Sequence, residues 1–181
     1  MVPRDGEVLH FSEDPSIEVF VPHVARTARE GTPYVWAVDA RRAQDYWFPR
    51  DCPRAMSWVA AGTSARDREL IVGVGGAERV HVVEYGWLER MRTVELFAYR
   101  LPAVSFRPFG EPTPHAHVST EVVEPLGQAE AVGDLFGLYA GAGIELRVAG
   151  NLWVFVDAAS ASSLGFSGIR LGNARPRELH R

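Results

Sequence analysis

Apolar residues in this chain come in short runs that end at prolines, glycines or acidic residues, and this punctuation restricts its fold more than any other feature. Residues 34–38, 79–85 and 94–101 are β-branched and aromatic or alternate with a period of two, which is typical of strands. Residues 128–139 carry apolar side chains at helical spacing, with glycines placed to end a helix. Many strands and few helices favour an α+β fold with a mostly antiparallel sheet that can be split in two.

Other segments add to this expectation. The same signals predict strands over residues 8–11, 17–21, 118–123, 144–148, 152–156 and 166–171, and short helices over 40–46, capped by Asp39, and 87–92. Glycines 73, 75 and 76 lack the spacing of a dinucleotide loop and predict a turn. With no tandem repeat or low-complexity linker in 181 residues, we expect a single globular domain over residues 1–181.

Composition removes several classes of function. All 19 basic residues are arginine, so chemistry that needs a Schiff-base or phosphate-loop lysine is excluded. A net charge of -4 gives no reason to expect tight nonspecific binding to nucleic acid, although a local arginine patch leaves nucleic acid open as a partner. The only cysteine, Cys52, cannot form an internal disulfide or a thiolate zinc cluster. Because no apolar signal segment and no run of 18 apolar residues is present, we expect a cytoplasmic protein without a membrane partner.

Residues 46–54 combine three aromatics, two prolines and two arginines. Proline fixes its own φ and biases the residue before it toward extended geometry, so Arg50 and Arg54 should be carried on a stiff loop. Guanidinium groups bind phosphate or carboxylate through two hydrogen bonds and stack on rings such as Tyr46. The segment therefore predicts a site for a nucleotide or another anionic small molecule. The alternative is a structural loop in which the arginines pair with Asp51 or a neighbouring acid.

Polar residues on the predicted strands suggest further site residues. Alternate residues of a strand share a face, so His10 and Ser12 should point the same way, as should Ser119 and Glu121. Structural alternatives are a histidine bonded to a backbone carbonyl and a solvent-facing acid.

A pair of histidines offers a competing site. His115 and His117, two apart on an extended segment, could both reach one metal ion and serve a metal-dependent hydrolase, but the sequence spacing supplies no third ligand. Candidates for that ligand are His81, Asp134 and Glu121. We expect no metal, and we expect Cys52, which lies between Asp51 and a proline, not to be a nucleophile.

Three segments resemble a bacterial family of uncharacterised proteins of about 180 residues. The segments are 9–15 (LHFSEDP), 46–54 (YWFPRDCPR) and 167–174 (SGIRLGNA), so the resemblance spans nearly the whole chain. It brings no established activity.

More distantly, the chain resembles the ADP-ribosyltransferase-like superfamily. His10 and Ser12 are similar to the strand whose histidine holds the nicotinamide ribose, and Glu121 is similar to the catalytic acid. Tyr34 and Tyr46 compete for the aromatic position, and Arg50 corresponds to an arginine that assists catalysis in the DNA-targeting members. The resemblance implies NAD as a substrate, held by His10, Ser12, Tyr46 and Arg54, and transfer of ADP-ribose to an unknown acceptor by Glu121 and Arg50.

The chain also departs from that superfamily. Ser119 stands where the arginine-modifying enzymes have a second glutamate. The main alternative is a noncatalytic module that binds an anionic metabolite or a carboxylate through Arg50 and Arg54.

Overall fold

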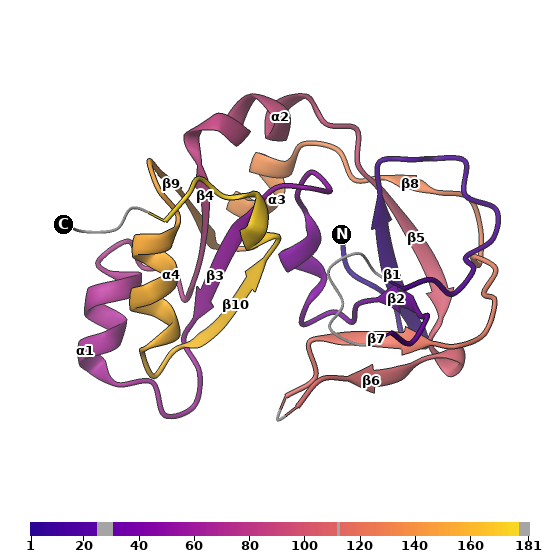
Figure 1. The fold of residues 1–181 in the computed structure, drawn as a ribbon, viewed down its shortest axis with the longest axis horizontal. Helices are drawn as coiled ribbons and strands as arrows, with labels where there is room; N and C mark the ends of the chain where they lie inside the picture. Colours follow the sequence, from indigo (N-terminus) through magenta and orange to yellow (C-terminus); the bar gives the residue numbers. More distant parts are fainter. Residues whose placement is uncertain (25–30, 112, 178–181) are drawn as a thin grey trace. The chain divides into compact units, whose positions relative to one another are not determined.

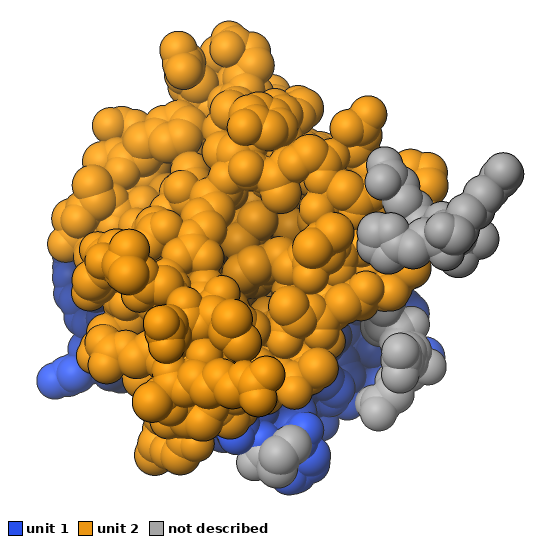
Figure 2. All heavy atoms as spheres, turned by 90° about the vertical axis from the view of Figure 1, so that its left-hand side faces the viewer, with its two compact units in different colours: residues 1–50, 94–133 blue, residues 51–93, 134–181 orange. Residues whose placement is uncertain are grey.

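The computed structural model describes residues 1–24, 31–111 and 113–177. The chain folds into two compact units, coloured separately in Figure 2. Unit 1 comprises Met1–Arg50 and Val94–Gly133, and unit 2 comprises Asp51–Thr93 and Asp134–Arg181.

Unit 1 is built from two three-stranded antiparallel sheets (Figure 1). One has the order β1-β5-β8 and the other β2-β7-β6, and a bridge between Leu9 and Val38 joins β1 to the end of β2. The strands are β1 (Glu7–Ser12), β2 (Val35–Ala37), β5 (Phe97–Pro102), β6 (Arg107–Phe109), β7 (Ala116–Ser119) and β8 (Glu130–Ala131), with short 3-10 turns at Ala43–Tyr46 and Ala103–Ser105.

The two faces of β1 pack in different clusters. Val8 lies in a core with Tyr99 of β5, Val35 of β2 and Phe20. Leu9, on the opposite face, packs with Val38 and Ala43, and the rings of Phe11 and Tyr46 lie against them. Because alternate residues of a strand share a face, His10 and Ser12 lie on the Val8 side of β1.

Unit 2 has a four-stranded mixed sheet of order β10-β3-β4-β9, in which β4 and β9 run parallel and the other pairs are antiparallel. Helices lie on both faces of this sheet. The elements are β3 (Arg54–Trp58), β4 (Arg79–Glu84), β9 (Ile144–Ala149), β10 (Gly165–Ile169), α1 (Ala65–Asp67), α2 (Leu88–Thr93), α3 (Leu135–Gly141), α4 (Trp153–Ser160), a π-helical turn (Arg68–Val72) and 3-10 turns at Tyr85–Trp87 and Leu171–Asn173.

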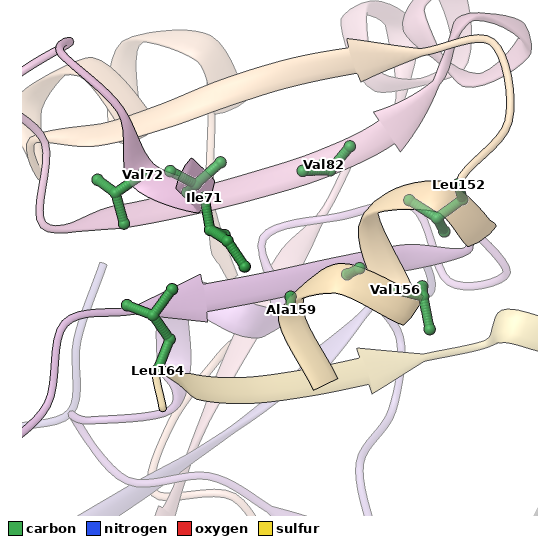
Figure 3. Packing of buried hydrophobic residues seen from close by; sticks show 9 residues of the cluster. Ile71, Val72, Val82, Leu152, Val156, Ala159 and Leu164 are labelled. Carbon is green, nitrogen blue, oxygen red and sulfur yellow. The ribbon is translucent and has the colours of Figure 1, made fainter. Parts of the chain in front are cut away.

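Side-chain alternation along β4 explains the layers of unit 2. Val80 and Val82 join the core cluster formed with the π-helical turn and with α4, and Figure 3 shows Val82 together with Ile71, Leu152 and Val156 of this cluster. His81 points to the other face, where its ring packs edge-on against Tyr139 of α3 at 5.5 Å between centroids. β4 is thus buried on both faces, and helices cover the sheet on each side.

The predicted α+β class is confirmed, with antiparallel and mixed open sheets and few short helices. The predicted strand over residues 152–156 is wrong, because this segment begins α4. Its first backbone N–H groups are satisfied by side chains, since Leu152 donates to the Glu84 carboxylate at 3.0 Å and Trp153 donates to the Asn151 side-chain oxygen at 3.0 Å. These acceptors favour a helix start at this point.

The helix predicted over residues 128–139 is wrong in its first half. Glu130–Ala131 is strand β8, paired with β5, and α3 begins only at Leu135. Gly133 has a φ of +81°, and the Asp134 carboxylate accepts the Phe136 N–H at 3.0 Å as the N-cap. A left-handed glycine followed by a capping acid separates the two elements.

Arg100 of β5 stabilises unit 1 through two carboxylates. Its guanidinium donates to Glu130 at 2.6 and 3.1 Å and to Glu7 at 2.6 Å. The Arg100 guanidinium lowers the pKa of Glu130, and the Arg4 backbone N–H, followed by Arg100, lowers the pKa of Glu7.

Replacing Arg100 with alanine should therefore lower the free energy of unfolding by about 1–2 kcal/mol at pH 7, a modest loss because Glu130 is partly exposed. A carboxyl group whose pKa is lower in the folded than in the unfolded protein stabilises the fold at pH values above its pKa in the unfolded protein. This contribution is lost as the pH falls through the pKa of the folded protein. The variant should thus lose less stability than the wild type on going from pH 6 to pH 3, as measured by urea denaturation. If the free energy of unfolding depended on pH equally in both proteins, Arg100 would not be the group that stabilises the two carboxylates.

Candidate functional site

His10 is the centre of a polar cluster in unit 1. Its Nδ1–H donates to the carbonyl oxygen of Trp36 at 2.7 Å, which fixes the tautomer and leaves Nε2 as an acceptor. The centroid of the His10 ring lies 4.8 Å from the centroid of the Phe20 ring. Burial lowers the pKa of His10, the hydrogen bond to Trp36 opposes this, and the charges of Arg50 and His23 lower the pKa further. At neutral pH the site therefore presents an uncharged imidazole acceptor.

Arg50 lies within electrostatic range of His10. Its backbone N–H donates to the Glu13 carboxylate at 2.9 Å, which ties the end of the 46–50 segment to the turn after β1. The Arg50 side chain is exposed, and within the described residues its guanidinium makes no hydrogen bond or ion pair.

Ser12 lies on the same face of β1 as His10. It is 3% exposed, and its hydroxyl oxygen accepts the Asp14 N–H at 3.1 Å, which shapes the turn that carries Glu13. The Ser12 side chain thus holds the backbone of this turn.

Glu121 is not on a strand, contrary to the prediction for residues 118–123. Strand β7 ends at Ser119, whose hydroxyl oxygen accepts the Glu121 N–H at 3.1 Å and turns the chain. The Glu121 side chain is exposed. Two residues later, Val123 pairs with Phe20 through two backbone hydrogen bonds of 2.8 and 2.9 Å, and Phe20 is the ring beside His10. The segment that carries Glu121 is therefore anchored to the neighbourhood of His10.

The two candidate aromatics have packing partners elsewhere in unit 1. Tyr46 packs with Leu9 against the other face of β1. Tyr34 is 6% exposed, and its hydroxyl oxygen accepts from Arg107 at 3.1 Å. Its ring forms an aromatic cluster with Trp36 and Phe109.

Arg54 does not lie on a loop with Arg50. It begins β3 in unit 2, is 3% exposed, and its guanidinium donates to the Cys52 carbonyl oxygen at 3.0 Å. Cys52 is fully buried, and burial raises the pKa of its thiol to about 12. The thiol is therefore protonated at neutral pH, for a reason other than the neighbouring Asp51 that the sequence suggested.

The paired histidines are not joined by a third metal ligand within the described residues, where no group of three metal-binding side chains occurs. His115 packs on Phe109, and burial together with the charge of Arg42 lowers its pKa. His81 and Asp134, the proposed partners, belong to unit 2, where Asp134 caps α3.

Sequence reasoning missed Glu13 and Glu84. Glu84, at the end of β4, is 3% exposed, and its carboxylate accepts N–H groups from Leu152 and Arg175 at 3.0 Å each. The sequence signal for Glu84 was an acidic residue at the end of an apolar strand. The signal for Glu13 was the acidic turn that follows His10.

The fold and the residues around His10 define an α+β protein in which His10 lies within electrostatic range of Arg50, whose exposed guanidinium has no hydrogen bond or ion pair among the described residues. In the described ranges no helix is long and apolar enough to cross a membrane. The chain belongs to the family of unknown function DUF6886, whose model matches residues 9–174. No curated protein and no solved structure matches it.

Proposed function

We propose that unit 1 binds NAD in the manner of an ADP-ribosyltransferase-like protein and transfers ADP-ribose to an acceptor. The observation that carries this proposal is the neutral imidazole of His10, held by the Trp36 carbonyl within electrostatic range of Arg50. A neutral acceptor near an exposed guanidinium that has no partner among the described residues matches a ligand that combines sugar hydroxyls with phosphate groups.

Each group has a separate task in this proposal. The Nε2 of His10 accepts a hydrogen bond from a ribose hydroxyl, and the Arg50 guanidinium binds the diphosphate through two hydrogen bonds. Glu13 positions Arg50 by accepting its backbone N–H. Ser12 shares the His10 face, whereas Tyr46 and Arg54 receive structural roles because they pack on the other face of β1 and in the interior of unit 2.

Glu121 supplies negative charge to the reaction. When the bond between ribose C1′ and nicotinamide breaks, nicotinamide leaves with the bonding electrons and positive charge develops on the ribose ring. A carboxylate that accepts a hydrogen bond from a ribose hydroxyl stabilises that charge. The acceptor nucleophile then attacks C1′ and releases its proton. The exposure of Glu121 is consistent with a site that admits both NAD and an acceptor.

Calorimetric titration of NAD tests binding without knowledge of the acceptor. Wild type should bind saturably, and His10→Ala and Arg50→Ala should each weaken binding about tenfold or more, as expected for the loss of one hydrogen bond to a charged group. Arg92→Ala, which removes an exposed arginine from α2, is the matched control and should bind as wild type does. Glu121→Gln should bind NAD but release no nicotinamide.

Two results would count against the proposal. Absence of heat over a wide range of NAD concentration would remove NAD as the ligand, and nicotinamide release by Glu121→Gln at the wild-type rate would remove the catalytic acid.

A noncatalytic anion-binding module is the second candidate, favoured by the exposed Arg50 guanidinium that has no partner within the described residues. It predicts that inorganic pyrophosphate binds as well as NAD does. Binding would then depend on Arg50, and substitutions of His10 and Glu121 would leave it unchanged.

A further inference from the structure

A groove of about 620 Å³ in unit 2 is lined by residues that follow β4, by Glu84 at the end of β4, by Gly150 and by residues 173–175. Tyr85, Gly86 and Trp87, which follow β4, form part of its lining, and Asn173 and Arg175 from the end of the chain form another part. Asn173 also donates to the Asp51 carbonyl oxygen at 2.8 Å, so the 167–174 segment meets the 51–54 segment here.

A buried carboxylate holds the chain in place at this groove. Glu84 accepts the backbone N–H of Arg175 through both oxygens, at 3.2 and 3.0 Å, and the Arg175 guanidinium donates to the Gly150 carbonyl oxygen at 3.0 Å. Trp153 fixes the same segment by donating to the Arg175 carbonyl oxygen at 2.9 Å. Arg175, which lines the groove, is thus held through its backbone N–H, its carbonyl oxygen and its guanidinium.

The turn that leads into the groove adopts an unfavourable backbone conformation. Arg170 has a φ of +56° and is the only residue other than glycine with a positive φ in the described part of the chain. Gly168 packs so closely on Leu171 that an added Cβ would lie 2.7 Å from its side chain. Backbone strain of this kind persists only where the surroundings enforce it, and it is concentrated at functional sites. Arg170 immediately precedes the 3-10 turn Leu171–Asn173, which leads to Asn173 and Arg175 in the groove lining.

The lining determines which ligand chemistry fits. Tyr85 is 67% exposed, Trp87 is partly exposed, and Gly86 and Gly150 carry no side chain and leave open space beside the backbone. The exposed Arg175 guanidinium forms no ion pair with any carboxylate of the described residues. Aromatic rings stack on planar ligands, and a guanidinium selects an anion.

We propose that this groove is a second ligand site, independent of the His10 cluster, and that it binds a planar aromatic molecule bearing a carboxylate or a phosphate. The rings of Tyr85 and Trp87 contact the planar body. Arg175 binds the anionic group, and the side-chain oxygen of Asn173 accepts from a polar substituent.

Nuclear magnetic resonance of the Trp87 indole N–H, assigned with Trp87→Phe, tests this site. The probes are adenosine monophosphate and indole-3-carboxylate, with adenosine and indole as their uncharged counterparts. At least one anionic probe should shift the Trp87 signal saturably and bind about tenfold or more tightly than its uncharged counterpart. A response to the phosphate probe alone identifies a phosphate site, and a response to the carboxylate probe alone identifies a carboxylate site.

Substitutions of two neighbouring arginines show whether Arg175 holds the anionic group. Arg175→Ala should weaken the anionic probe about tenfold, whereas Arg177→Ala, which removes an arginine bound to Asp157 in the same segment, should not. Arg175→Gln provides the same test with less change in volume if the alanine variant does not fold. The proposal is overturned if neither anion shifts Trp87, if the uncharged probes bind equally, or if His10→Ala rather than Arg175→Ala abolishes the response.

Discussion

Glu84→Ala should lower the free energy of unfolding by about 3–5 kcal/mol, because it leaves buried hydrogen-bond donors without an acceptor. The carboxylate accepts N–H groups from Leu152, at the start of α4, and from Arg175. Leu152 is fully buried, so water cannot replace the lost acceptor there. The substitution therefore affects the start of α4 and the attachment of the C-terminal segment together.

Guanidinium chloride denaturation measures this loss. Glu84→Gln should fall between wild type and Glu84→Ala, since the amide keeps one acceptor oxygen but turns an NH₂ group toward N–H donors. Glu89→Ala is the matched control, because Glu89 is an exposed acid of α2 in the same unit. A loss in Glu84→Ala no larger than in the control would show that the carboxylate does not support α4.

Tyr99→Ala should cost unit 1 a similar amount, about 3–5 kcal/mol, by opening a cavity in its core. The Tyr99 ring is 1% exposed and packs edge-on against Phe20 at 5.2 Å between centroids. Its hydroxyl donates to the Asp14 carbonyl oxygen at 2.6 Å and accepts the Ile17 N–H at 3.0 Å. Tyr99 thus stabilises both the core and the turn after β1.

Tyr99→Phe separates these two contributions. Retaining the ring and removing the hydroxyl should cost about 1–3 kcal/mol, because Asp14 and Ile17 each lose a hydrogen-bond partner. Tyr85→Ala, at an exposed tyrosine, should change stability by less than about 0.5 kcal/mol. If Tyr99→Phe is as stable as wild type, the hydroxyl bonds contribute no net stability and the ring accounts for the whole effect.

Local patterns were sufficient to predict most strands of this protein. The stretches that became β1, β2, β4 and β9 alternate or are β-branched, and the sheets they enter bury at least one face of each. The errors arose where groups far away in the sequence determine whether a segment forms a strand or a helix. The apolar run 152–156 fits a buried strand as well as a buried helix, and the Glu84 carboxylate that favours the helix start is far away in sequence.

Two errors had local signals that hydrophobic periodicity obscured. Gly133 and Asp134 mark an interruption and a helix cap inside the predicted 128–139 helix. Ser119 accepts the N–H of Glu121, a short-range bond that ends a strand whose composition alone favours extension through residue 123.

The candidate site was predictable only in part. Periodicity placed His10 and Ser12 on one face of β1. The Trp36 carbonyl that fixes His10 and the Glu13 carboxylate that fixes Arg50 are brought there by the pairing of distant segments, which the sequence pattern does not show. The proline-rich 46–54 segment looks like one loop in the sequence. Its two arginines nevertheless belong to different units, with Arg50 exposed and Arg54 in the interior.

The path of the chain also bears on how the protein is made. It passes from one unit to the other after Arg50, after Thr93 and after Gly133, so neither unit is contiguous in sequence. On the ribosome, β3 and β4 emerge before unit 1 is complete. Their remaining partners in the sheet, β10 for β3 and β9 for β4, are synthesised later. Strand edges left unpaired during translation are prone to aggregation. We therefore expect the nascent chain to engage chaperones until residue 169 has left the exit tunnel, and no single cut in the gene to yield either unit alone.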